Sequence, residues 1–142
     1  MELLVVVVIM GILTAIALPA YQKSVMKGHR SEAEQLMLQV ASLEQQYFID
    51  ARTYSQALGS AGLNIPSANG WTCATTDPGN CSNTYYTVSA TVTTPTSGPA
   101  YFVIKAVPSG KQASDGTLYF NADKTGAYSL GAKTRTADDN GW

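Results

Sequence analysis

The sequence predicts an α+β protein in which a long N-terminal α-helix packs on a four-stranded antiparallel sheet. Three observations lead to this fold class. An uncharged apolar run extends from Leu3 to Leu18. A stripe of apolar residues at helical spacing follows it. After residue 84, the period changes to two, which is typical of β-strands. We therefore expect a helix with an apolar first half and an amphipathic second half, followed by the sheet.

The apolar run begins directly after Glu2 and ends at Pro19. As a helix it would be roughly 24 Å long, a little less than the ~30 Å hydrocarbon core of a bilayer. Three interpretations compete. No Lys or Arg precedes the run, which disfavours a secretory signal peptide. A simple membrane anchor leaves the charge of Glu2 unexplained. The third interpretation is a helix that first lies in the membrane and then packs against copies of itself.

The second half of the predicted helix carries one apolar face. Its members, at spacings of three and four, are Ala33, Leu36, Val40, Leu43 and Tyr47. The charged and amide residues between them are expected on the solvated face: Glu32, Glu34, Gln35, Gln39, Glu44, Gln45 and Gln46. Pro19 lies within the helical pattern and should kink the helix. We expect one long, gently bent helix from about residue 2 to about residue 50.

Residues 51–83 are predicted to form a loop region because Gly and Pro interrupt it repeatedly. Cys73 and Cys81 flank a Pro78-Gly79 pair that fits a type II turn and would bring the two thiols together. A disulfide closing so short a loop would stabilise the fold by roughly 2–3 kcal/mol; free thiols are the alternative. We expect no metal site, because the single histidine, His29, is distant in sequence.

Four segments then alternate and are rich in β-branched and aromatic residues: residues 85–93, 101–107, 117–121 and 126–130. Their short connections predict an antiparallel sheet. One face of this sheet should bury the apolar stripe of the helix. A separate all-β domain on a stalk is the alternative, but four short strands alone would bury little apolar area.

The residues from Glu2 to Gln22 resemble the N-terminal signature of type IV pilins and of their pseudopilin relatives. The matching features are the leading acidic residue, the Val/Ile/Leu run, a Gly-Ile-Leu-x-Ala-Ile-Ala core and Pro-Ala-Tyr-Gln. The resemblance implies that residues 1–24 anchor the chain in a membrane and form the core of a filament. Residues 25–142 would form the globular head of the pilin.

The resemblance also implies roles for three residues of the first helix half. Glu2 would pair with the amino terminus of an adjacent subunit. A carboxylate in an apolar bundle is costly unless a positive group neutralises it, so this pairing would select the stagger of the subunits. Gly11 and Pro19 would bracket the part of the helix that loses helicity within the filament.

The chain also departs from the family pattern. The basic leader that a prepilin peptidase removes before N-methylation is absent ahead of Glu2, so we expect Met1 to correspond to an internal position of that pattern. The C-terminal third resembles the tail of PilE-like pilins, in which two cysteines are commonly bridged. Asp115 and Gly141 occupy the places of those cysteines here, so the usual C-terminal bridge is expected to be absent.

The expected function is that of a structural subunit of a type IV pilus, used for adhesion, twitching motility or DNA uptake. The alternative is a pseudopilin of a type II secretion system. The implied partners are other pilins, the inner membrane before assembly, the pilus assembly machinery and the prepilin peptidase. The chain would start in the inner membrane and end in a pilus on the cell surface.

Composition argues against other function classes. The net charge is −1 and 13% of the residues are charged, so we expect no direct binding of nucleic acid. No catalytic constellation and no phosphate-binding motif occurs, so we expect neither enzymatic activity nor a cofactor. Asp138 and Asp139 could bind calcium, but they lack spaced partners and are interpreted as a solvated tail.

Overall fold

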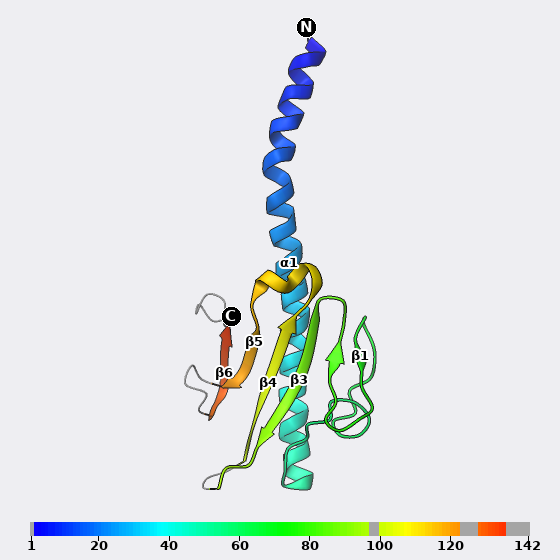
Figure 1. The fold of residues 1–142 in the computed structure, drawn as a ribbon, viewed down its shortest axis with the longest axis vertical. Helices are drawn as coiled ribbons and strands as arrows, with labels where there is room; N and C mark the ends of the chain where they lie inside the picture. The colour runs from blue at the N-terminus through cyan, green and yellow to red at the C-terminus, as the bar shows by residue number, and fades with distance from the viewer. Residues whose placement is uncertain (1, 97–99, 123–127, 136–142) are drawn as a thin grey trace. The chain divides into compact units, whose positions relative to one another are not determined.

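The computed structural model describes residues 2–96, 100–122 and 128–135. Within these residues it contains a long α-helix, a short 3-10 helix and six strands (Figure 1). The chain divides into two compact units, residues 1–32 and residues 33–142. The predicted functional boundary after residue 24 concerns the roles of the two parts and stays a prediction.

Helix α1 extends from Glu2 to Ala51 and includes Pro19, which confirms the long helix predicted from the sequence. The helix continues beyond Pro19 because the residues on both sides are good helix formers. The kink expected at Pro19 stays a prediction. Arg52 follows with φ 58°, a left-handed conformation, while its N–H still donates to the Phe48 carbonyl at 2.9 Å. This left-handed residue ends the helix.

The second half of α1 buries one face, as the spacing predicts. Its buried residues are Ala33, Leu36, Met37, Val40 and Ala41, with Leu43 and Tyr47 partly buried beside them. Glu44 corrects the prediction for the solvated face, because its side chain is completely buried. It follows Val40 by four residues and Ala41 by three, so it lies on the buried side of the helix.

The loop region after α1 contains two very short strands, β1 (Thr72–Cys73) and β2 (Cys81–Ser82). These strands pair antiparallel with Cys73 opposite Cys81. The predicted type II turn between them is wrong, because the Asp77–Pro78 peptide bond is cis and Gly79 is not at positive φ. The loop is instead held by a parallel bridge between Ala57 and Gly79.

The remaining strands are β3 (Tyr86–Thr93), β4 (Tyr101–Pro108), β5 (Leu118–Ala122) and β6 (Tyr128–Arg135), and the 3-10 helix η1 (Gly110–Asp115) joins β4 to β5. All six strands form one antiparallel sheet in sequence order. The predicted antiparallel arrangement is therefore confirmed. The sheet has two more strands than expected, because the residues around each cysteine are extended and pair beside β3.

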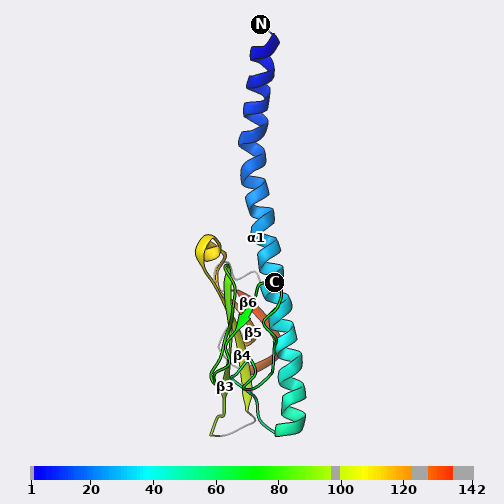
Figure 2. The same cartoon turned by 90° about the vertical axis from the view of Figure 1, so that its right-hand side faces the viewer.

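The core lies between the second half of α1 and one face of the sheet (Figure 2). Residues of β3 alternate between buried and partly exposed up to Ala90, and those of β4 do so up to Ala106. The largest buried side chains include Tyr86, Phe102, Met37, Leu58 and Ile104. The packed α+β arrangement is thus the one observed, rather than an all-β domain on a stalk.

Candidate assembly surface

The first part of α1 exposes its apolar side chains on all sides. Between Leu3 and Leu18, the least exposed large apolar side chain is that of Val6, and it is still 49% exposed. The helix contains a segment long and apolar enough to cross a membrane, a test that a signal sequence also passes. Burying one such side chain completely is favourable by a free energy of about 1.5–3 kcal/mol relative to leaving it in water. Among the surfaces of the described chain, this segment therefore has the strongest tendency to be buried against lipid or against another protein.

Of the three residues with predicted roles in the first helix half, Gly11 lies on this segment, and Glu2 and Pro19 flank it. Glu2 is the first residue of α1, and its pairing with a neighbouring subunit stays a prediction. A Cβ added at Gly11 would meet no heavy atom within 4 Å, apart from the backbone of the helix itself. Pro19 has no N–H, so the helix lacks one backbone hydrogen bond there. The loss of helicity between Gly11 and Pro19 concerns the filament and also stays a prediction.

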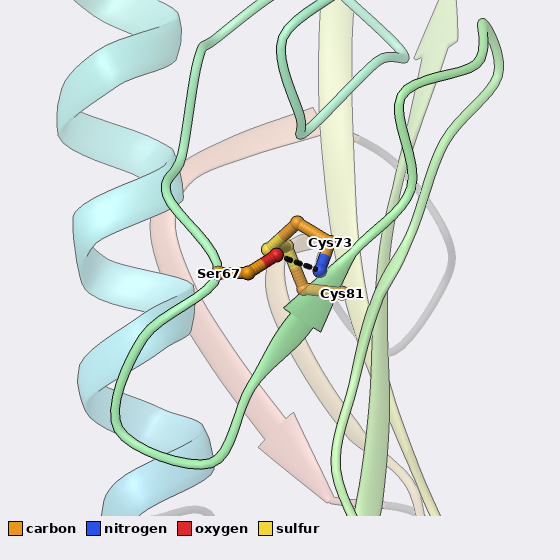
Figure 3. Close-up of a disulfide and its surroundings, with 3 residues drawn as sticks. All are labelled: Ser67, Cys73 and Cys81. Carbon is orange, nitrogen blue, oxygen red and sulfur yellow. Dashed lines mark hydrogen bonds between the residues drawn. A yellow bond between two sulfur atoms is a disulfide. The ribbon is translucent and has the colours of Figure 1, made fainter.

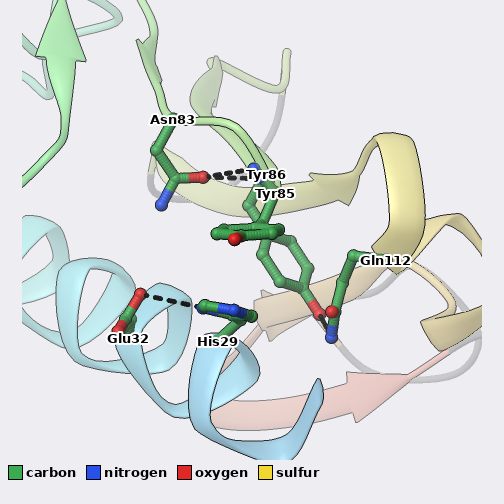
Figure 4. A network of polar contacts seen from close by, with 6 residues as sticks. All are labelled: His29, Glu32, Asn83, Tyr85, Tyr86 and Gln112. Carbon is green, nitrogen blue, oxygen red and sulfur yellow. Dashed lines mark hydrogen bonds and ion pairs between the residues drawn. The ribbon is translucent and has the colours of Figure 1, made fainter. Parts of the chain in front are cut away.

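Two polar side chains contact each other near the end of the first unit. Nδ1 of His29 lies 3.5 Å from Oε2 of Glu32, one helical turn away (Figure 4). Within the described residues, no cluster of three His, Cys, Asp or Glu side chains is arranged to hold a metal ion. Asp138, Asp139 and Gly141 lie outside the described residues.

A disulfide joins Cys73 and Cys81 across the β1–β2 pair (Figure 3). The N–H of Cys73 donates to the hydroxyl oxygen of Ser67 at 3.0 Å. The loop closed by the disulfide packs tightly on the preceding segment, because a Cβ added at Gly59 would lie 2.0 Å from the carbonyl oxygen of Ala74. The disulfide and this close approach together fix the loop next to β3.

A buried polar cluster connects β3 to η1, and sequence reasoning missed it. The phenol of Tyr86 donates a hydrogen bond to Oδ2 of Asp115, and the side-chain amide of Gln112 donates to the phenol oxygen at 3.2 Å (Figure 4). All three side chains are almost completely buried. No local sequence pattern indicates this cluster, because Tyr86 in β3 is more than 25 residues away from Gln112 and Asp115 in η1.

The start of β3 has its own polar anchor. Oδ1 of Asn83 accepts hydrogen bonds from the backbone N–H groups of Tyr85 and Tyr86, at 2.8 and 2.7 Å (Figure 4). An Asn that precedes a strand and bonds the amides two and three residues ahead is an Asx-type turn. This anchor places the Tyr86 side chain on the buried face, where it reaches η1.

Glu44 is the second polar feature that sequence reasoning missed. Its Oε2 accepts a hydrogen bond from the backbone N–H of Ser55 at 3.0 Å. Its Oε1 is buried and has no hydrogen-bond partner among the described residues. Burial raises the pKa of this carboxyl group from 4.5 to about 7, although the hydrogen bond from Ser55 acts in the opposite direction.

Comparison with known proteins gives one family. The family model described as "Type IV minor pilin ComP, DNA uptake sequence receptor" matches residues 19–119. The match begins at Pro19 and covers the second half of α1, the disulfide loop and the sheet as far as β5. No curated protein and no solved structure matches the chain.

Proposed function

The chain belongs to the family of the type IV minor pilin ComP, a DNA uptake sequence receptor, and from this membership we propose that it assembles through its N-terminal helix into a cell-surface filament. Family membership makes it a pilus subunit; the proposal concerns how it is anchored and assembled. The observation that carries the proposal is the exposed apolar segment from Leu3 to Leu18.

In this proposal the apolar segment has two successive environments. The segment first spans the inner membrane, where lipid surrounds its side chains. It then leaves the lipid when the helices of other pilins surround it instead, so the apolar side chains never enter water. Lipid and apolar side chains solvate the segment about equally well, and specific packing must therefore select the filament.

Glu2 supplies the specificity in this proposal. A carboxylate within a bundle of apolar helices is tolerated only beside a positive group, and loss of one partner of a buried ion pair costs about 3–5 kcal/mol. The amino terminus of a neighbouring pilin is the proposed partner. The pair would fix the axial stagger of the subunits, because any other stagger leaves both charges buried and unpaired.

The test is to replace Glu2 by Gln in the full chain, expressed in a cell that assembles the filament. We expect normal levels of the variant in the membrane and at least about a tenfold loss from sheared surface pili. The free energy lost with the ion pair exceeds about 1.4 kcal/mol, which corresponds to a factor of about ten. Asp50→Asn is the matched control, because it removes an exposed carboxylate from the same helix. Wild-type amounts of E2Q in sheared pili would disprove the assembly role.

The family description names a DNA uptake sequence receptor, which favours DNA uptake among the pilus functions and makes direct DNA binding a second candidate. The charge of the second unit does little to support direct DNA binding. Residues 33–142 contain six basic residues (Arg52, Lys105, Lys111, Lys124, Lys133 and Arg135) and eight acidic residues. A DNA contact here would therefore depend on a few local cations rather than on a strongly positive surface.

The two candidates are separated by measuring DNA binding by the full chain in detergent micelles. A structural subunit binds uptake-sequence DNA and a scrambled duplex equally weakly. A receptor prefers the uptake sequence by about 1–3 kcal/mol per mismatched base pair, and its affinity falls with salt according to the few phosphates it contacts. A sequence preference would overturn the expectation that this chain does not bind nucleic acid directly.

A further inference from the structure

Glu44 lies where a carboxylate is not expected, on the face of α1 that packs into the core. Its side chain is completely buried, and the helix residues one turn before it, Val40 and Ala41, are buried as well. Oε2 accepts the N–H of Ser55, whereas Oε1 has no hydrogen-bond partner among the described residues. A charge on this group would therefore be only half stabilised.

The residue that Glu44 holds lies in a short segment, residues 52–56. A backbone hydrogen bond holds each end of this segment: the Arg52 N–H donates to the Phe48 carbonyl at 2.9 Å, and the Gly79 N–H donates to the Gln56 carbonyl at 3.1 Å. Arg52, Thr53 and Gln56 are exposed. The ring of Tyr54 packs against Phe48, with ring centroids 4.7 Å apart, and against Phe102, at 4.9 Å. The hydrogen bond between Ser55 and Glu44 is the polar link between this segment and the buried face of the helix.

The far side of the segment is firmly fixed. The hydroxyl oxygen of Ser55 accepts the N–H of Ala57 at 3.1 Å, and a Cβ added at Gly62 would lie 2.1 Å from that oxygen. Ala57 and Leu58 are completely buried. Ala57 and Leu58 therefore belong to the core, so an opening around Glu44 would be confined to residues 52–56 and would also have to break the contacts of the Ser55 hydroxyl.

We propose that Glu44 is a proton-operated latch, in which the neutral carboxyl group keeps residues 52–56 on the helix and loss of its proton lets them separate. Because Oε2 is occupied as an acceptor, the proton resides on Oε1. Burial is the main cause of the raised pKa of about 7, so the latch changes state near neutral pH. Separation of the segment would admit water to Oε1 and hydrate the charge.

Other ionisable groups of the elements packed around this core do not set the equilibrium, since burial and the Ser55 amide are the causes of the shift in the Glu44 pKa. Tyr86 and Asp115 are bonded to each other. Lys105 and Tyr119 pair with each other at sheet positions that alternate with buried Ile104 and Phe120, so they lie on the opposite face of the sheet. The ionisable groups that follow Glu44 on α1 and in the segment are Tyr47, Asp50, Arg52 and Tyr54.

The test uses the full chain in detergent micelles and two NMR measurements. The first is the titration of the Glu44 side-chain carboxyl carbon, for which we expect a midpoint near 7. The second is hydrogen exchange of the Ser55 amide, corrected for its intrinsic pH dependence and compared with the Ile104 amide in β4. The ionised fraction rises from roughly one tenth at pH 6 to roughly nine tenths at pH 8, so protection of Ser55 should fall about tenfold while that of Ile104 stays constant.

Glu44→Gln keeps an acceptor for the Ser55 N–H but cannot ionise, so it should make the protection of Ser55 independent of pH. Asp50→Asn is the matched control and should keep the tenfold loss, because Asp50 is exposed on the same helix. A Glu44 midpoint near 4.5, constant Ser55 protection in the wild type, or a persisting pH dependence in E44Q would each overturn the proposal. The first two outcomes are measured on the wild type and do not require the variant to fold.

Discussion

Tyr86→Phe tests whether the buried polar cluster between β3 and η1 stabilises the second unit. The substitution removes only the hydroxyl group, and Phe keeps the ring in the core. In the wild type this hydroxyl donates to the carboxylate of Asp115 and accepts from the side-chain amide of Gln112. Because these side chains are almost completely buried, water cannot replace the lost partner without opening the core.

The expected loss follows from the type of hydrogen bond. A buried hydrogen bond to a charged group contributes about 1.5–3 kcal/mol, and a neutral one about 1 kcal/mol. Asp115 and Gln112 retain other interactions, so the full cost of two isolated polar groups does not apply. We expect Tyr86→Phe to lower the free energy of unfolding by about 2–3 kcal/mol.

The assay is thermal or guanidinium unfolding of the full chain in detergent, followed by near-UV circular dichroism. All aromatic residues except Tyr21 belong to residues 33–142, so this signal reports on the second unit and not on the apolar helix. Tyr119→Phe is the control, because Tyr119 pairs with Lys105 on the opposite face of the sheet. We expect Tyr119→Phe to lower the free energy of unfolding by no more than about 0.5 kcal/mol.

A double-mutant cycle with Asp115→Asn isolates the contact. If Tyr86 and Asp115 interact as the structure shows, the two substitutions together cost less than the sum of the single losses, with a coupling of about 1 kcal/mol or more. A loss below about 0.5 kcal/mol for Tyr86→Phe, or additive losses in the double variant, would refute the reasoning.

Three further predictions use the same unfolding assay. Replacing Cys73 and Cys81 together by Ala should cost roughly 2–3 kcal/mol from the loop they close, and no loss would mean that backbone contacts suffice. Gly59→Ala should cost about 1–3 kcal/mol, because its Cβ would clash with a backbone oxygen 2.0 Å away; an unchanged midpoint would contradict that close approach. The raised pKa of Glu44 predicts that this residue's contribution to the free energy of unfolding is fully present below pH 4.5 and is lost as pH rises to about 7. The change in the free energy of unfolding should be about 3 kcal/mol. Glu44→Gln should abolish this slope, and a slope unchanged in E44Q would assign it to other groups.

The helix and the central strands could be predicted because their signals are local. Apolar residues at spacings of three and four mark the second half of α1, and the left-handed residue after Ala51 ends it within one residue of the expected position. Alternation in β3 and β4 identifies strands with one buried face. Short connections then leave an antiparallel order as the simplest topology. In each case, nearby residues contain the required information.

The buried polar groups could not be predicted, because their partners are distant in sequence. Glu44 lies among glutamines and other acidic residues, and composition alone places it in water. Only the position of Ser55, brought back against the helix after it ends, makes burial tolerable. The same holds for Asp115, whose partner is 29 residues away in β3. Strands β1 and β2 could not be predicted from the sequence either, because a strand of two residues is too short to show an alternating pattern.

The division of burial along α1 is the strongest argument that the chain works in an assembly or a membrane. Every described member of the core lies at or after Ala33, so the second unit completes its core without the apolar segment. Stability of the head therefore does not explain why the residues from Leu3 to Leu18 are apolar on all sides. A helix with no polar face is stable only when something apolar surrounds it. The proposed function supplies these surroundings: lipid before assembly and the helices of other pilins in the filament.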